Sequence, residues 1–410
     1  MTTATSDACI GNTQSQGDVG SQPAYWSGVF AMSLCVFALI ASEFMPVSLL
    51  TAIAADLHVS EGMAGQGIAI SGAFAVLTSL SISALADSMS RKTLLLALTA
   101  VMAVSGVVVA LASNFLVYMI GRALIGVVIG GFWSMSAATA MRLVPASQVS
   151  RALAIFNGGN ALATVIAAPL GSYLGSNMGW RAAFFCLVPV AAVALFWQWV
   201  SLPAMQAQER SPGSGNVFKV LKNRSVAIGM AACGTFFVGQ FALFTYVRPF
   251  LETVTHADVS TLSMVLLIIG AAGFVGTLLI GNVLKRGLYG TLIVIPLLMA
   301  GIAVALIPFG AWVAAVMALL GLWGLMATSA PVGWWTWIAE AMPHNAEAGG
   351  GLMVAVIQLS IALGSTVGGL LFDSTGYRST FAASAVVLLL AALLTFLASQ
   401  ATRSQTDESP

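Results

Sequence analysis

The sequence predicts an all-α membrane protein with twelve transmembrane helices in two six-helix bundles, related by a parallel pseudo-two-fold axis. Three observations support this fold. Of the 410 residues, 59% are hydrophobic and only 7% are charged, whereas a soluble domain has roughly 25% charged residues. Twelve apolar runs are long enough to cross a bilayer. One loop pattern also recurs in both halves of the chain.

The scarcity of charge excludes several classes of protein. Fifteen Lys and Arg with fourteen Asp and Glu are too few to cover a globule in water, so we expect the lipid bilayer to be the main solvent. The net charge of +1 provides no basic field, and no nucleic-acid polymer is expected as a partner. The four cysteines show no disulfide or metal-ligand spacing.

The N-terminus favours a resident membrane protein over a secreted one. Residues 1–24 are polar and lack the basic start and short apolar core of a signal peptide, so they are predicted to be a disordered cytoplasmic tail. Tyr25 and Trp26 then form an aromatic pair suited to the membrane interface. The first apolar run is therefore predicted to be a permanent transmembrane helix.

The apolar runs divide into six plus six. Residues 25–200 are predicted to form the N-terminal bundle and residues 225–400 the C-terminal bundle, with a cytoplasmic linker at 201–224 and a cytoplasmic tail at 401–410. The linker is the long hydrophilic stretch inside the chain. The expected spans are 26–54, 64–86, 93–112, 115–140, 152–176, 181–200, 226–250, 260–284, 288–308, 311–338, 349–372 and 379–399.

The basic residues predict the orientation. With a cytoplasmic N-terminus, eleven Lys and Arg fall on the cytoplasmic side and three, Arg181, Arg248 and Arg378, fall on the other side. This distribution follows the positive-inside rule and places both termini in the cytoplasm. The remaining basic residue, Arg122, lies inside a span.

An internal repeat supports the two halves independently. The loop Gly179-Trp180-Arg181-Ala182-Ala183-Phe184 recurs as Gly376-Tyr377-Arg378-Ser379-Thr380-Phe381, an offset of 197 residues. The same offset carries Glu43-Phe44 onto Gln240-Phe241. Matching loops after the same number of spans indicate a parallel repeat, in which two halves rock around a central site.

Two charged residues lie deep inside spans, where each costs several kcal/mol unless it is paired or hydrated. Glu43 lies roughly 16 Å and Arg122 roughly 12 Å below the same face, at 1.5 Å per helical residue. A carboxylate that exchanges a proton beside a permanent cation is suited to proton coupling. The alternative is a buried ion pair that only fixes helix packing.

Pro46 lies next to this carboxylate. It removes the amide that would bond the carbonyl of Ser42, so that carbonyl is free for substrate or water. Membrane helices also tolerate prolines without any functional role, and both interpretations stay open.

Uncharged polar and aromatic groups at membrane depth are candidates for binding substrate. Amides donate and accept hydrogen bonds, which suits a neutral ligand better than a lipophilic cation, although each amide is also able to bond a neighbouring helix. The cluster Trp334, Trp335 and Trp337 is predicted to be an interfacial belt. No metal site, catalytic constellation or ATP-binding loop is apparent. The substrate-binding candidates are Trp133, Asn157, Asn160, Gln240 and Gln358.

Three motifs resemble the major facilitator superfamily, and within it the drug:proton antiporters. Ser83-x-x-x-Asp87-Ser88-Met89-Ser90-Arg91-Lys92 resembles the signature between the second and third spans, which implies gating roles for Asp87, Arg91 and Lys92. Gly121-Arg122-x-x-x-Gly126 resembles the motif whose arginine is associated with proton coupling. Ala168-Pro169-Leu170-Gly171 resembles the antiporter motif and implies export, with Pro169 and Gly171 as its key residues. The first motif departs from the signature at three serines, and Ala168 replaces a glycine.

Longer stretches resemble bacterial exporters of purine ribonucleosides, among them Glu43–Thr51, Gly239–Pro249 and Pro331–Trp337. The resemblance implies a proton antiporter of purine ribonucleosides or analogues, working by alternating access in the bacterial inner membrane. It implies no enzymatic activity and no cofactor besides the proton gradient, and we expect a monomer. Relatives that export sugars or drugs share much of the pattern, and a membrane sensor without transport is the third alternative.

Overall fold

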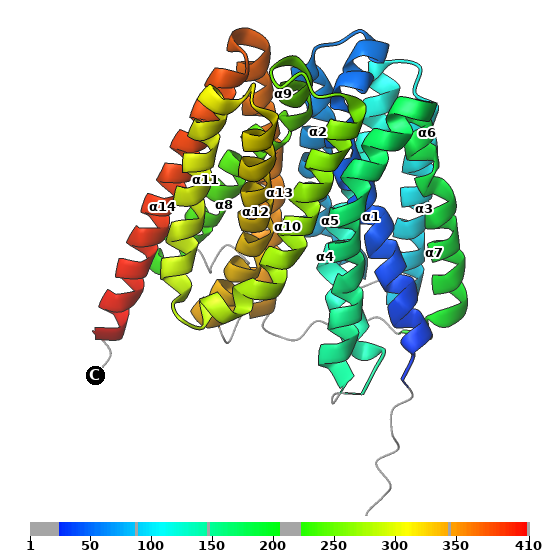
Figure 1. Ribbon diagram of the computed structural model, residues 1–410. Coiled ribbons are helices and arrows are strands. Elements are labelled where there is room, and N and C mark those ends of the chain that lie inside the picture. Colours follow the sequence, from blue (N-terminus) through cyan, green and yellow to red (C-terminus); the bar gives the residue numbers. More distant parts are fainter. Residues whose placement is uncertain (1–23, 87–88, 146–147, 206–222, 343–345, 408–410) are drawn as a thin grey trace, which may run out of the picture.

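The computed structural model describes residues 24–86, 89–145, 148–205, 223–342 and 346–407. Within these ranges all regular structure is helical, and twelve segments are long and apolar enough to span a membrane, which confirms the predicted number. Figure 1 shows the helices side by side as two groups, with the C-terminus at the lower end. We call the end where α1 begins and α14 ends the terminal face, and the opposite end the far face.

The first group of helices comes from the first half of the chain. Its helices are α1 (Trp26–Leu57), α2 (Glu61–Ala86), α3 (Arg91–Ala110), α4 (Phe115–Arg142), α5 (Val149–Met178), α6 (Trp180–Phe185) and α7 (Leu187–Ser201). The second group consists of α8 (Arg224–Phe244), α9 (Val247–Thr253), α10 (Val259–Leu284), α11 (Leu288–Phe309), α12 (Val313–Ala341), α13 (Ala346–Thr375) and α14 (Tyr377–Asp407).

Two spans are broken into a pair of helices, and prolines explain both breaks. A proline has no amide to donate to the carbonyl four residues earlier. For Pro189 that carbonyl belongs to Phe185, where α6 ends, and for Pro249 it belongs to Thr245, directly after α8. The pairs α6–α7 and α8–α9 therefore form single spans, Trp180–Ser201 and Arg224–Thr253.

The helix packing repeats between the halves. In the first bundle α2 packs on α4 and α1 on α7, and in the second bundle α10 packs on α12 and α8 on α14. The two bundles touch at two places, α2 against α13 and α5 against α10. Since α10 corresponds to α2 and α13 to α5, the pseudo-two-fold axis relates the two contacts to each other. The packing confirms the parallel pseudo-two-fold predicted from the repeated loop.

The repeated loops adopt the same backbone conformation. Gly179 has φ +85° and Gly376 has φ +81°, a left-handed region that is strained for residues with a Cβ atom. The arginine two positions later covers an aromatic ring in each case, with Arg181 4.5 Å from the Trp180 centroid and Arg378 5.9 Å from the Tyr377 centroid. The two repeated loops therefore also place their arginine and aromatic side chains in the same way.

Replacing either loop glycine with alanine is expected to lower the free energy of unfolding by about 1 kcal/mol, because alanine is strained at positive φ. Thermal unfolding of Gly179→Ala and Gly376→Ala in detergent measures this. Gly301→Ala is the matched control, since Gly301 lies inside α11 with open space at its Cβ position. Equal melting temperatures for all three variants would contradict the expectation.

Candidate proton and substrate site

The Arg122 side chain is buried at the junction of α1, α2 and α4, with 1% of its surface exposed. Its guanidinium donates to three backbone carbonyls, those of Ser42 at 2.7 Å, Gly67 at 3.0 Å and Glu43 at 3.3 Å. It also donates to the Ser71 hydroxyl at 3.2 Å. Backbone dipoles and one hydroxyl, and no carboxylate, therefore solvate this buried cation.

The contact with Ser42 explains why α1 carries a proline at this depth. Pro46 lies inside α1 and leaves the Ser42 carbonyl without its helical donor. The Arg122 guanidinium provides that missing donor, in the shortest of its hydrogen bonds. The freed carbonyl predicted from the sequence is thus occupied by a protein cation.

The Glu43 carboxylate reaches the second bundle. It is 5% exposed, and its Oε1 atom accepts a hydrogen bond of 3.3 Å from Gln358 Nε2 in α13. Glu43 and Arg122 are neighbours, but they form no ion pair in the structure. The alternative of a buried Glu43–Arg122 ion pair is therefore not formed, and separate hydrogen bonds hold the two groups.

Residues matched by the repeat meet beside this carboxylate. Phe44 of α1 and Phe241 of α8 stack with ring centroids 6.0 Å apart and planes inclined by 22°. The preceding residue of α8, Gln240, is 8% exposed, and its Oε1 atom has no hydrogen-bond partner among the described residues. Two bundles thus meet at a carboxylate, two amides and an aromatic pair, with one buried acceptor unsatisfied.

Hydrogen bonds between the bundles lie on one side of this centre. Apart from the Glu43–Gln358 bond, the inter-bundle hydrogen bonds whose two partners are both described lie nearer the far face. The Asp373 carboxylate accepts from the Ser60 hydroxyl and from the Gly62 amide, the latter at 3.0 Å. The other links join Thr366 to Gln66 at 3.1 Å, Ser263 to Ser172 at 3.3 Å, and Arg248 to the Ser48 carbonyl. We call this set the far-face latch.

Close backbone contact accompanies the latch. A Cβ atom on Gly62 would lie 2.7 Å from the Gly369 carbonyl oxygen, so α2 and α13 touch through two glycines. On the other side of the pseudo-axis, a Cβ atom on Gly270 of α10 would lie 2.7 Å from Val165 Cα of α5. The backbones of the two bundles therefore approach each other closely at both contacts.

The other substrate-binding candidates are not brought to this centre by hydrogen bonds. Trp133 packs edge-on against Phe156 at 6.2 Å within the first bundle. Asn157 is exposed and donates to Leu153 of its own helix, and the Asn160 carbonyl accepts from Thr164.

The family motifs occupy distinct places. Asp87 lies outside the described residues. Lys92 donates to the Leu202 carbonyl at 2.5 Å and so ties the start of α3 to the end of α7. Pro169 lies within α5, and a Cβ atom on Gly171 would lie 2.7 Å from Ser48 Oγ, so Gly171 permits the close approach of α5 to α1.

The tryptophan cluster corrects one prediction. Trp334 and Trp337 are 2% and 1% exposed, and only Trp335 has the exposed surface expected of an interfacial belt. Trp337 donates to the Tyr289 hydroxyl at 3.1 Å, inside the second bundle. Trp334 and Trp337 are three residues apart, so they lie on one face of α12, and that face points inward. This spacing predicts a shared face, which hydropathy alone does not report.

Sequence reasoning missed most of the latch. Asp373 and Gln66 carry no motif, since each acts through a partner roughly 300 positions away in the chain. The sequence does contain a signal for Arg248. It lies inside the apolar run 226–250, which indicates a buried arginine, whereas the orientation argument counts it among the residues on the non-cytoplasmic side. It is 7% exposed and pairs with Glu252 at 2.8 Å.

Twelve spans in two repeated bundles, which meet at buried polar groups and are bonded together toward one face, are typical of a membrane transporter. The chain belongs to the Major Facilitator Superfamily, whose sequence profile matches residues 32–365. This membership in a transporter family confirms the prediction that the protein is not an enzyme.

Two curated proteins are similar to this chain over most of its length. It is 66% identical to the transcription regulatory protein OpdE of Pseudomonas aeruginosa, over 97% of this chain and 98% of that protein. It is 42% identical to the purine ribonucleoside efflux pump NepI of Salmonella enteritidis, over 90% of this chain and 93% of that one. Among solved structures, a mutant of the nucleoside transporter NupG has a TM-score of 0.72 at 13% identity, covering 91% of this chain and 98% of NupG. That last likeness concerns the fold.

Proposed function

We propose that this protein is a proton-coupled exporter of purine ribonucleosides or close analogues. In this mechanism Glu43 exchanges the proton, and the surrounding amides and aromatic rings hold the ligand. The observation that carries the proposal is the buried Glu43 carboxylate bonded across the bundle interface to Gln358. A titratable group at the contact between two moving bodies links its protonation to their relative position.

The chemistry of the centre suits a neutral heterocyclic ligand. Gln240 has a buried acceptor without a partner, and Gln358 has an amide that reaches only Glu43. Aromatic faces such as Phe44 and Phe241 favour stacking on a purine ring. The relationship to a purine ribonucleoside efflux pump supports the same ligand class and the outward direction.

The proposed setting is the bacterial inner membrane, with the protein acting as a monomer. The excess of basic residues on the terminal face supports a cytoplasmic location for both termini. In that orientation the far-face latch closes the periplasmic side. Ligand then enters from the cytoplasm, and protons enter after the latch opens.

Everted membrane vesicles with an acidic lumen test this function. Labelled inosine is expected to accumulate in the lumen and to be released when the pH gradient is collapsed. Uptake of labelled sugars and cationic dyes under the same gradient distinguishes the related exporters. Preference for a sugar or a dye would overturn the proposed substrate, and gradient-insensitive inosine flux would overturn the coupling.

A second candidate function is regulation of gene expression from the membrane. The 66% identity to a protein named as a transcription regulator favours it. Reconstituted protein separates the two functions, because an exporter moves protons when inosine is added and a sensor without transport does not. Transcript levels in cells with Glu43→Gln then show whether any regulatory effect requires transport.

The two central amides are expected to contribute directly to ligand affinity. Replacing Gln240 or Gln358 with leucine should raise the Kd for inosine about tenfold each. A hydrogen bond contributes about 1 kcal/mol, and a polar group of the ligand that is buried without a partner lowers the binding free energy further. Binding to purified protein measures the change. Asn177→Leu is the control, because the Asn177 amide bonds Tyr173 of its own helix at the far end of α5. An equal effect of all three substitutions would contradict a direct contact.

A further inference from the structure

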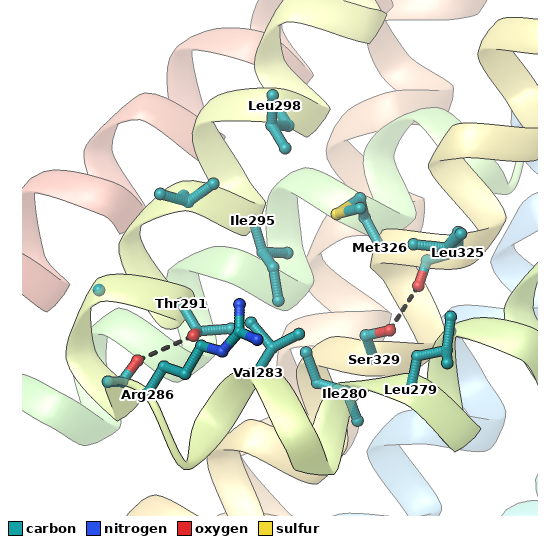
Figure 2. A pocket seen from close by; sticks show the side chains of 14 residues that line it. Leu279, Ile280, Val283, Arg286, Thr291, Ile295, Leu298, Leu325, Met326 and Ser329 are labelled. Atoms are coloured by element: carbon teal, nitrogen blue, oxygen red, sulfur yellow. Dashed lines mark hydrogen bonds between the residues drawn. The ribbon is translucent and has the colours of Figure 1, made fainter.

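A groove runs along the outer surface of the second bundle, remote from the proposed transport site. Figure 2 shows it between α10, α11 and α12, with apolar side chains along its length and Arg286 at one end. Its volume is about 470 Å³. The transport mechanism proposed above uses none of its residues.

The walls of the groove face the hydrocarbon. Leu279 and Val283 of α10 are 55% and 46% exposed, and Val294 and Leu298 of α11 are 50% and 49% exposed. In a membrane-spanning bundle such side chains contact acyl chains. The hollow arises because Gly290 has open space at its Cβ position on the α11 side.

The polar groups in the groove are already satisfied. Ser329 donates to the Leu325 carbonyl at 2.6 Å, and Thr291 donates to the Gly287 carbonyl at 2.8 Å, both within their own helices. Figure 2 shows both bonds along the helices. Because no hydroxyl there requires a partner, an apolar chain fills the groove without leaving a buried donor unpaired.

The mouth of the groove is cationic. Arg286 lies in the turn between α10 and α11, is exposed, and has no carboxylate partner among the described residues. In Figure 2 its guanidinium reaches over the groove toward Val283 and Thr291. An exposed arginine at the end of transmembrane helices is suited to a phosphate head group.

The length of the groove matches one leaflet. From Gly276 to its end at Leu284, α10 advances roughly 12 Å at 1.5 Å per residue, and the turn adds two more residues as far as Arg286. Half of a hydrocarbon core of about 30 Å is the same length. A lipid with its phosphate at Arg286 therefore has one acyl chain lying along the groove as far as the bilayer midplane.

We propose that this groove is a binding site for one anionic phospholipid of the leaflet at the terminal face. The phosphate is held by Arg286, and one acyl chain lies between α10 and α11 over the floor formed by α12. Zwitterionic lipids fit the apolar part equally well, so the selectivity for anionic lipid arises at the charged mouth.

Binding of spin-labelled phosphatidylglycerol and phosphatidylcholine to the full-length protein in detergent tests the proposal. Arg286→Gln is expected to weaken phosphatidylglycerol binding about tenfold, the loss expected for one charge-assisted contact. It should weaken phosphatidylcholine binding less, because the choline cation of that lipid offsets the charge of its phosphate. Lys285→Gln is the control, because it removes the same charge from the adjacent residue, which does not line the groove. Equal effects of the two substitutions, or equal affinity for the two lipids, would overturn the site.

A second pair of variants tests the apolar part. Gly290→Leu fills the groove and should reduce binding of both lipids, while Gly301→Leu, at another open glycine of α11, should not. Inorganic phosphate at millimolar concentration should fail to displace phosphatidylglycerol, because it has no acyl chain. Displacement by phosphate, or unchanged binding to Gly290→Leu, would show that the groove is not the site. Thermal unfolding of each variant verifies that it is folded.

Discussion

Glu43→Gln should abolish accumulation of inosine driven by a pH gradient. Coupling between two ligands typically amounts to about 1–3 kcal/mol, so accumulation should fall at least about fivefold when the proton site is removed. The substitution keeps the size of the side chain and its ability to accept from Gln358, so the fold should be retained. Transport in everted vesicles measures the loss.

The pH dependence gives a second readout of the same variant. In an antiporter the proton and the ligand favour different states of the carrier, so inosine affinity of the wild type should fall as the pH falls and Glu43 becomes protonated. In Glu43→Gln the affinity should be independent of pH and close to the low-pH value of the wild type. A pH-dependent variant that still accumulates inosine would refute the role of Glu43.

Asp56→Asn provides a matched control for the charge change. Asp56 lies in the same helix, at its far end, and forms an ion pair of 2.6 Å with Arg181. Both side chains are partly exposed, at 42% and 35%, and exposed pairs contribute little to stability. Coupled transport by Asp56→Asn should equal that of the wild type.

Arg122→Met should produce the largest loss of stability among single substitutions at the site. It leaves the Ser42 carbonyl without any donor, and it removes one hydrogen bond each from Gly67 and Ser71, of which Ser71 keeps its bond to the Ile68 carbonyl. One orphaned buried group costs about 1–3 kcal/mol, so the free energy of unfolding should fall by about that amount. Thermal unfolding in detergent measures it, with Arg151→Met, an exposed arginine of α5, as the control.

A second substitution identifies the cause of that loss. Pro46→Ala restores the amide that bonds the Ser42 carbonyl within α1. In the Arg122→Met background it should therefore recover about 1 kcal/mol, a coupling that a double-mutant cycle isolates. If the two substitutions are simply additive, Arg122 does not act as the substitute donor for Ser42.

The sequence predicts the spans and the repeat well because both depend on local composition. Apolar length reports membrane crossing, and an offset of 197 residues identifies the symmetry that Phe44 and Phe241 display by stacking on each other. The depth of Glu43 and Arg122 was also predictable, since each residue of a helix adds a fixed rise.

The partners of the buried charges were not predictable by the same route. Arg122 is solvated mainly by backbone carbonyls, which every residue carries, so no side-chain pattern marks them. The bond from Glu43 to Gln358 depends on how α1 and α13 are rotated, and hydropathy does not report rotation. The burial of Trp334 was missed for the same reason.

The far-face latch also sets how tightly the empty carrier is sealed against leakage. Opening that face breaks four sets of hydrogen bonds, one of which joins the Asp373 carboxylate to the start of α2. It also separates Gly62 from Gly369. At about 1 kcal/mol net for each bond, the open form of the unloaded protein is a minor species. In the proposed antiport cycle the protein reorients with either ligand or protons bound, so we expect reorientation of the unloaded protein to be rare and passive proton slip through it to be small.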